Sequence, residues 1–246
     1  RFSAIIRGMC NSIYFTQNVQ TYNMPDYFTH SILSQVAFER LEKNVRDCIA
    51  DRKLYLLGAQ GGDVFFMYNL NKSANLGRRL HALDAQFVFE NLCRGNPSYA
   101  AGYATHYALD STIHPAVYAF EATCRAPFAH LAFEKDIGLY VSRKFSTPRK
   151  IMPKDDVCGA TFAIYDCVKK LDDSITLTGV ERCLKRYFTY TRAIYARKKQ
   201  TYKFDYDYSS LSPIIEKSID KAVQCVRCVI EQNIDEKLFS ESFLQH

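Results

Sequence analysis

The sequence contains no tryptophan and only ten glycines and seven prolines among its 246 residues. So little glycine and proline excludes collagen-like repeats and low-complexity linkers, and an apolar content of 48% excludes a disordered chain. No apolar run approaches the ~18 residues that a membrane-spanning helix needs. Residues 1–23 also lack the apolar core and the small-residue cleavage site of a signal peptide. The composition therefore predicts a folded domain with ample apolar sequence for a core.

The sequence does not begin with methionine, and its first orderly helical pattern follows Met24-Pro25-Asp26. We therefore expect Met24 to be the natural start and residues 1–23 to be an extraneous N-terminal extension. Residues 24–246 are then expected to form one all-helical domain, with residues 151–246 supplying supporting helices.

Charge and cysteine content indicate the setting in which the protein works. Lysine and arginine exceed aspartate and glutamate by six (32 against 26), an excess that tolerates phosphates, lipid headgroups or nucleic acid without choosing among them. The nine cysteines are odd in number and irregularly spaced, which favours reduced thiols and a cytoplasmic protein over a disulfide framework. Cys225 and Cys228 form a lone CxxC pair, which we interpret as core packing.

The apolar residues recur with helical spacing nearly throughout, and they predict an all-α, multi-helix bundle. We expect helices at about 26–50, 76–92, 97–113, 128–145, 156–170, 179–199 and 213–235, with a short apolar helix after Gly61-Gly62-Asp63. Thr178 and Glu181 have the spacing of a capping box at the start of the sixth. Pro115 disfavours helical geometry at the residue before it, so we expect the third helix to end near His114.

Five of the six histidines lie in the first 130 residues, in predicted helices or at their ends: His30, His81, His106, His114 and His130. Two carboxylates accompany them at helical spacing. Asp110 stands four residues from both His106 and His114, and Glu134 stands four residues after His130. Neutral imidazole with carboxylate is ligand chemistry that Zn²⁺ prefers, and helix bundles commonly build metal sites from inward-facing pairs of this kind.

Each of these observations has an ordinary structural explanation. A single histidine beside an apolar face is usually a hydrogen-bonded core residue, and a carboxylate four residues away is often a surface pair. Asp63, after two glycines, has the position of a helix N-cap. The concentration of histidines favours a metal cluster instead, because His81 and His130 stand among apolar neighbours where an unpaired polar group is costly.

Four ordered motifs then resemble one known family. They are Gly58-Ala59-Gln60-Gly61-Gly62-Asp63-Val64-Phe65-Phe66, Leu80-His81, His106-Tyr107-Ala108-Leu109-Asp110-Ser111-Thr112-Ile113-His114-Pro115 and His130-Leu131-x-x-Glu134. Together they look like the zinc-dependent phospholipase C family, and more closely like its intracellular bacterial branch. That family has an all-helical, single-domain fold related to the single-strand-specific zinc nucleases. The resemblance covers residues 24–150, whereas residues 151–246 match only in being helical.

The resemblance implies a site with two or three zinc ions. Asp63, His81, His106 and Asp110 would hold the first ion, and His114, His130 and Glu134 would hold a second. His30 would join a third, with Asp110 bridging the first and third. Secreted members complete the third site with an N-terminal tryptophan, which this chain lacks. If Met24 starts the protein and is removed, Pro25 would offer its amine there instead.

The chemistry that such a site supports is phosphoester hydrolysis. The metals would bind the phosphate oxygens, lower the pKa of a bound water toward ~7 and stabilise the leaving alkoxide. Asp63 is the candidate catalytic base. The sequence has no G-x-S-x-G elbow, P-loop or dinucleotide fingerprint, so it offers no competing motif. We therefore expect an enzyme, a zinc-dependent phosphodiesterase.

The substrate is less well specified than the reaction. Aromatic residues beside the candidate ligands either line a mouth for acyl chains or nucleobases or belong to the core: Phe65, Phe66, Tyr68 and Tyr107. A basic run either binds anionic lipid or nucleic acid or forms a solvated helix face: Arg182, Lys185, Arg186, Arg192, Arg197, Lys198, Lys199 and Lys203.

Three hypotheses remain open at the level of sequence. The first is a phospholipase C-like phosphodiesterase acting on a phospholipid or related phosphoester, with peripheral contact to a membrane surface. The second is a zinc nuclease acting on single-stranded nucleic acid. The third is a non-catalytic helical protein in which bound metal stabilises the fold.

Overall fold

The computed structural model describes residues 26–69, 75–195, 201–241 and 243, and every regular element in these ranges is helical. The elements are α2 (Tyr27–Arg40), α3 (Lys43–Asp47), α4 (Arg52–Gly58), the 3-10 helix η1 (Gly61–Met67), α5 (Leu76–His81), α6 (Ala85–Leu92), α7 (Pro97–Thr123), α8 (Ala129–Lys144), α9 (Lys154–Gly159), α10 (Thr161–Val168), α11 (Leu177–Tyr195), the 3-10 helix η2 (Tyr208–Leu211) and α12 (Ser212–Ile230). The all-α prediction is therefore confirmed for the described residues.

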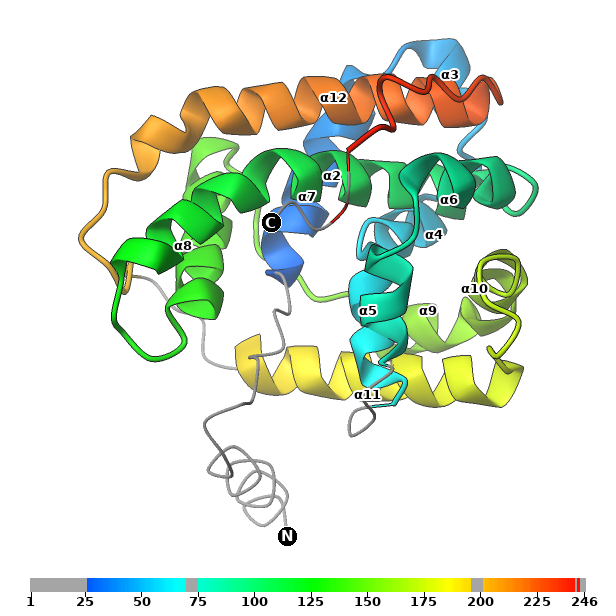
Figure 1. Ribbon diagram of the computed structural model, residues 1–246, viewed down its shortest axis with the longest axis horizontal. Helices are drawn as coiled ribbons and strands as arrows, with labels where there is room; N and C mark the ends of the chain where they lie inside the picture. The colour runs from blue at the N-terminus through cyan, green and yellow to red at the C-terminus, as the bar shows by residue number, and fades with distance from the viewer. Residues whose placement is uncertain (1–25, 70–74, 196–200, 242, 244–246) are drawn as a thin grey trace, which may run out of the picture.

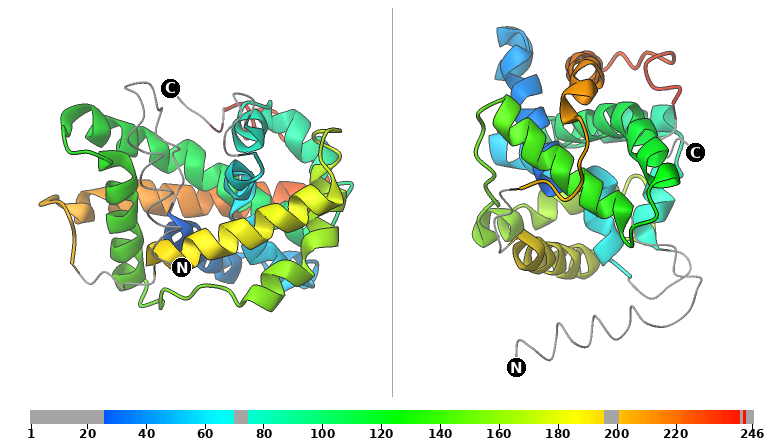
Figure 2. Two further views of the ribbon diagram at one scale, coloured as in Figure 1. Left: turned by 90° about the horizontal axis from the view of Figure 1, so that it is seen from below. Right: turned by 90° about the vertical axis from the view of Figure 1, so that its left-hand side faces the viewer.

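Helix α7 is the longest described helix and lies at the centre of the arrangement, with α12 along one side and α11 on the opposite side (Figure 1). It packs against α12, α4, α2 and α8, and α2 also packs against α8. The two further views show α11 crossing the face opposite α12 (Figure 2). Residues on α7 can therefore meet side chains from several other elements at one point.

Helix α7 begins as the sequence predicts. The side chain of Asn96 accepts the backbone N–H groups of Ser98 and Tyr99, at 2.9 and 3.3 Å. Pro97 occupies the first helical position, where its missing N–H costs nothing.

The expectation that α7 ends near His114 is wrong. The helix continues through Pro115 to Thr123, and the pyrrolidine ring of Pro115 is exposed. Proline inside a helix costs ~3 kcal/mol, so tertiary packing must offset that cost. The packing is present, because Phe120 stacks on Phe133 of α8 with ring centroids 3.9 Å apart and planes 7° from parallel. This extension of α7 is therefore held by α8 rather than by local propensity.

Three predicted helices are each divided in two. The range 76–92 contains α5 and α6, because the side chain of Asp84 accepts the N–H of Phe87 at 2.9 Å and begins a new helix. The range 26–50 contains α2 and α3, and α2 ends at Arg40. The range 156–170 is divided as well, into α9 and α10.

The predicted capping box at Thr178 is also wrong. Helix α11 begins at Leu177, and its cap is Thr176, whose hydroxyl accepts the N–H of Gly179 at 3.1 Å. Glu181 instead pairs with Lys185 on the solvent side of the helix.

The described cysteines are free thiols, and Cys225 is buried in α12 as the core interpretation of the CxxC pair predicts. None of the described helices combines the length and the apolar character needed to cross a bilayer. The proposed start at Met24 and the amine of Pro25 lie outside the described residues, as do Arg197, Lys198 and Lys199.

Candidate metal centre

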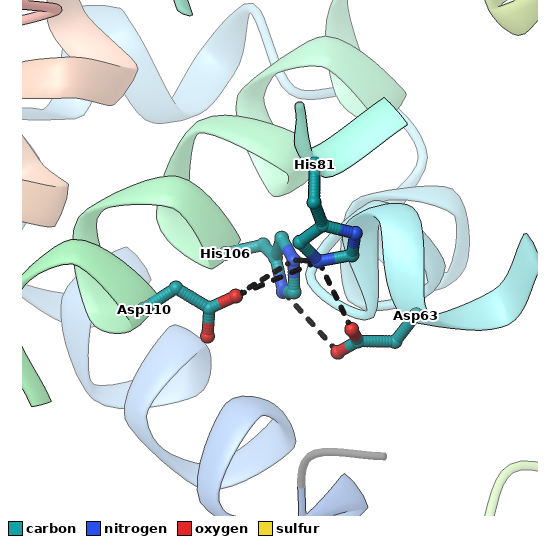
Figure 3. Close-up of side chains that lie close together, drawn as sticks. All are labelled: Asp63, His81, His106 and Asp110. Carbon is teal, nitrogen blue, oxygen red and sulfur yellow. Dashed lines mark hydrogen bonds and ion pairs between the residues drawn. The ribbon is translucent and has the colours of Figure 1, made fainter. Parts of the chain in front are cut away.

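Four side chains from three elements meet beside the middle of α7. Asp63 comes from η1, His81 from the end of α5, and His106 and Asp110 from one face of α7 (Figure 3). His81 Nε2 lies 3.2 Å from Asp63 Oδ1, and His106 Nε2 lies 3.2 Å from Asp110 Oδ2. The structure thus brings together the four residues predicted for the first ion, and all four are buried.

The separations between these atoms suit a shared metal ion. Ligand atoms at 2.0–2.2 Å from a tetrahedral zinc lie roughly 3.3–3.6 Å from one another. The Nε2 atoms of His81 and His106 are 3.4 Å apart, and the two nitrogen–oxygen pairs above are each 3.2 Å apart. Other separations in the group are longer, with His81 Nε2 3.8 Å from Asp110 Oδ2 and all four ligand atoms within 4.8 Å of one another, so a single cation would draw the four side chains closer together.

A second group lies farther along α7, where it meets α8. Glu134 Oε1 lies 3.4 Å from His114 Nε2 and 3.1 Å from His130 Nε2. All three side chains are buried, and they are the residues predicted for the second ion. His114 joins this group although α7 continues past it, so the helix does not have to end at His114 for that side chain to reach α8.

Asp110 lies between the two groups. Its Oδ2 faces His106 and, at 3.8 Å, His81. Its Oδ1 faces His30 Nε2 at 3.2 Å and His114 Nε2 at 3.9 Å. His30, from α2, therefore joins the site through Asp110, as the resemblance implied, whereas the amine expected to complete a third ion lies outside the described residues.

The fit to a cation is tested by the charges that the site buries. Within the described residues, Asp63, Asp110 and Glu134 form ion pairs with histidines alone, and no lysine or arginine pairs with any of them. Six buried polar atoms in these residues also lack a hydrogen-bond partner: His30 Nδ1, Asp63 Oδ1, His106 Nδ1, Asp110 Oδ2, His114 Nδ1 and Glu134 Oε2. Buried carboxylates need a counter-charge, and the donor set suits a metal cation.

The ring of His81 is held in the orientation that a ligand requires. Its Nδ1 lies 2.7 Å from the carbonyl oxygen of Gly77, and a carbonyl can only accept. The neutral ring therefore carries its proton on Nδ1, which leaves the Nε2 lone pair facing Asp63 and Asp110.

Two glycines allow η1 to approach the imidazoles. Gly61 has φ of +49°, and a Cβ there would lie 2.0 Å from His106 Cδ2. A Cβ at Gly62 would lie 2.6 Å from His81 Cε1. The carboxylate of Asp63 points into the site rather than capping a helix (Figure 3), so its interpretation as an N-cap is wrong. The Gly-Gly-Asp motif is explained by close packing on two histidine rings.

The carboxylates and imidazoles shift one another's proton affinity. Burial raises the pKa of Asp63 to about 6, although His81 acts against it. Burial also favours a raised pKa for Asp110, but the imidazoles of His106 and His114 outweigh it and hold that pKa well below its usual value. Burial lowers the pKa of His106 well below its usual value; the charge of Asp110 opposes this effect, and those of His30 and His81 add to it.

A small cavity of about 20 Å³ adjoins the site between α2, α7 and α8. Its polar lining includes His30, Asp110, His114 and Glu134, and its apolar lining includes Ile113. A cavity of this size holds roughly one water molecule. A water or hydroxide can therefore reach the side chains that link the two groups.

The aromatic residues beside the ligands belong mainly to the core. Phe65 and Tyr107 are fully buried, and Phe66 stacks on the ring of His81 with centroids 5.3 Å apart. Tyr68 is half-buried, and its hydroxyl accepts the N–H of Thr176 at 3.0 Å. These contacts confirm that the aromatic residues belong mainly to the core rather than to the mouth of a binding site.

The described part of the basic run lies on the exposed face of α11 and at Lys203 just beyond it. Lys185 is paired there with Glu181, and the guanidinium of Arg192 lies over the ring of Phe188. Both interpretations of the basic run require exposed side chains, so the choice between a solvated face and a surface for anionic partners stays a prediction.

The structure thus places the eight predicted ligands, from α2, η1, α5, α7 and α8, in two neighbouring groups, with Asp110 in contact with His30 and lying between the groups. Glu121, which sequence analysis did not single out, lies 2.8 Å from His130 Nδ1. Glu121 lies beyond the expected end of its helix near His114, and His130 belongs to the next helix, so the expected boundaries gave no reason to pair them. Comparison of the chain with models of known protein families, with curated proteins and with solved structures gives no match.

Proposed function

We propose that this protein is a zinc-dependent phosphoester hydrolase resembling phospholipase C. The observation that carries the proposal is the set of three buried carboxylates, surrounded by five imidazoles and paired with no lysine or arginine in the described chain. A set of histidine and carboxylate ligands without thiolates suits Zn²⁺, and a bridging carboxylate suits ions held close together.

The residues divide between two groups joined by Asp110. Zinc bound there would supply Lewis acidity toward phosphate oxygens and lower the pKa of a water. Asp110 would link the two groups, because its Oδ2 faces His106 and its Oδ1 faces His114. Asp63 presents two oxygens to the site, since Oδ1 lies 3.2 Å from His81 Nε2 and Oδ2 lies 3.6 Å from His106 Nδ1. We assign the oxygen that does not bind metal to orient the attacking water and accept its proton.

The substrate we propose is a phospholipid or a related phosphodiester, on the basis of the sequence resemblance. The experiment combines metal analysis of never-chelated protein with hydrolysis assays on bis(p-nitrophenyl) phosphate, short-chain lecithin and single-stranded DNA. Two or three zinc ions per chain and release of phosphocholine support the proposal. Cleavage of the DNA alone would favour the zinc nuclease instead. If chelation lowers the melting temperature and no substrate is hydrolysed, the enzyme assignment is overturned and the protein is a non-catalytic, metal-stabilised fold.

Metal uptake should release protons. Burial lowers the pKa of His114, but the charges of Asp110 and Glu134 outweigh it and raise that pKa to about 9. The pKa of His30 is raised in the same way, since Asp110 outweighs the effect of burial. The metal-free chain therefore holds protons at pH 7 that a ligating imidazole must lose. We expect zinc affinity to rise between pH 6 and pH 9 by more than tenfold.

The measurement is calorimetric titration of zinc into metal-free protein, in two buffers of different ionisation enthalpy. The observed heat should differ between the buffers at pH 7, and the difference should shrink as the pH approaches 9. By linkage, the stability that protonated His114 gives the metal-free chain is present at low pH and is lost as the pH rises through its folded pKa. Equal heats in both buffers at pH 7 would contradict the protonated state.

A further inference from the structure

The part of α7 beyond Pro115 carries two side chains to the second group. Tyr118 and Glu121 stand four and seven residues after His114, so they share its face of the helix. This continuation is the part of α7 that sequence analysis did not expect. Its packing on α8 therefore has a consequence for the site as well as for the fold.

Glu121 contacts a predicted ligand directly. Its Oε2 lies 2.8 Å from Nδ1 of His130, and Nε2 of the same ring lies 3.1 Å from Glu134 Oε1. A carboxylate that accepts the proton of Nδ1 fixes the tautomer in which Nε2 is free to bind a metal. His81 has the same arrangement, with the Gly77 carbonyl in place of the carboxylate.

Tyr118 lies beside the imidazoles of His114 and His130. Its ring centroid lies 5.6 Å from that of His114 and 5.5 Å from that of His130. The tyrosine therefore restricts rotation of both rings, while Glu121 sets the direction of one. The side chain of Glu121 is 41% exposed, against 4% for His130 and 6% for Glu134, so it reaches the buried group from the surface.

We infer that Glu121 is a positioning residue that orients His130 for metal binding in the second group. The inference rests on the proposed metal function and deepens it, because it names a residue outside the ligand set that governs one group and leaves the other untouched. Residues of this kind change metal affinity by ~10–100-fold when removed. In the part of the chain that the structure describes, Glu121 pairs with His130 and with no residue of the first group, so the effect should be confined to the second.

The test is titration of metal-free protein with Co²⁺, followed by its visible absorption, and competition of Zn²⁺ with a chelator. We expect Glu121→Ala to weaken one class of ions by ~10–100-fold and to alter only that class's contribution to the spectrum. Glu121→Gln keeps an oxygen that accepts from Nδ1, so it should recover most of the orientation. Glu181→Gln is the matched control, since Glu181 is an ion-paired carboxylate of similar exposure on α11.

The outcomes separate this inference from the proposed function. If wild-type protein binds Co²⁺ in two classes and Glu121→Ala binds both with unchanged affinity and spectrum, the positioning role is overturned and the metal site stands. If wild-type protein binds no Co²⁺ or Zn²⁺, both proposals fall. Far-ultraviolet circular dichroism of the metal-free variants serves as the control for unfolding. If the circular dichroism is unchanged but Glu121→Ala weakens both classes of bound ion equally, a role specific to His130 is overturned.

Discussion

Replacing Asp110 with asparagine is expected to reduce bound metal to less than about one ion per chain and hydrolysis by more than ~1,000-fold. The carboxylate lies between both groups, with Oδ2 3.2 Å from His106 Nε2 and Oδ1 3.9 Å from His114 Nε2, and Oδ1 also faces His30. Asparagine keeps the shape but removes the negative charge and puts hydrogens on one of the two facing positions. Metal analysis after gel filtration, together with turnover of bis(p-nitrophenyl) phosphate, measures both effects.

The matched control for that variant is Asp136→Asn. Asp136 is a fully buried carboxylate on α8 that accepts the N–H groups of Lys203 and Phe204 and the hydroxyl of Tyr208. Its replacement should cost ~1–3 kcal/mol of stability without loss of metal. Retention of two or more ions by Asp110→Asn would contradict the bridging role, whereas metal loss in both variants would point to general destabilisation.

Part of the candidate site could be predicted because its spacing is local. His106, Asp110 and His114 repeat every four residues, and any helix through them places all three on one side. Their meeting with Asp63 and His81 is not local, and it depends on η1 packing against α7. The sequence motif supplied the resemblance, while the structure supplies the reason for the two glycines.

The end of α7 could not be predicted because long-range packing decides it. Local geometry at Pro115 opposes the helix, and the stacking of Phe120 on Phe133 overrides it. Because the same packing continues α7 beyond Pro115, it also brings Glu121 to the second group. The failed boundary and the missed residue therefore have one physical cause, namely contact between α7 and α8.

One pattern in the sequence was open to a different interpretation. Tyr202, Phe204, Tyr206 and Tyr208 alternate with polar residues, a spacing typical of a strand, and no strand was predicted there. None of the described residues forms a strand, but the aromatic residues of this segment do pack inward. Phe204 lies 4.9 Å from Phe120, and Tyr206 lies 4.9 Å from Phe133, so the inward residues cover the contact that holds α7 to α8.

Replacing Asp63 with asparagine should separate metal binding from chemistry. The amide keeps an oxygen near His81 Nε2, where Asp63 Oδ1 lies at 3.2 Å, so most of the metal should remain bound. It cannot accept a proton from water, and loss of a general base costs ~100–10,000-fold in rate. We therefore expect turnover to fall by more than ~100-fold while metal content falls by less than half.

The pH profile distinguishes loss of the base from distortion of the site. With Asp63 as the base, the variant should lose the acidic limb of the wild-type profile and gain activity as hydroxide increases. Distortion would instead lower the whole profile in parallel, together with the metal content. A variant with wild-type turnover would overturn the assignment of Asp63 as base, and its metal content would then show whether the carboxylate serves only as a ligand.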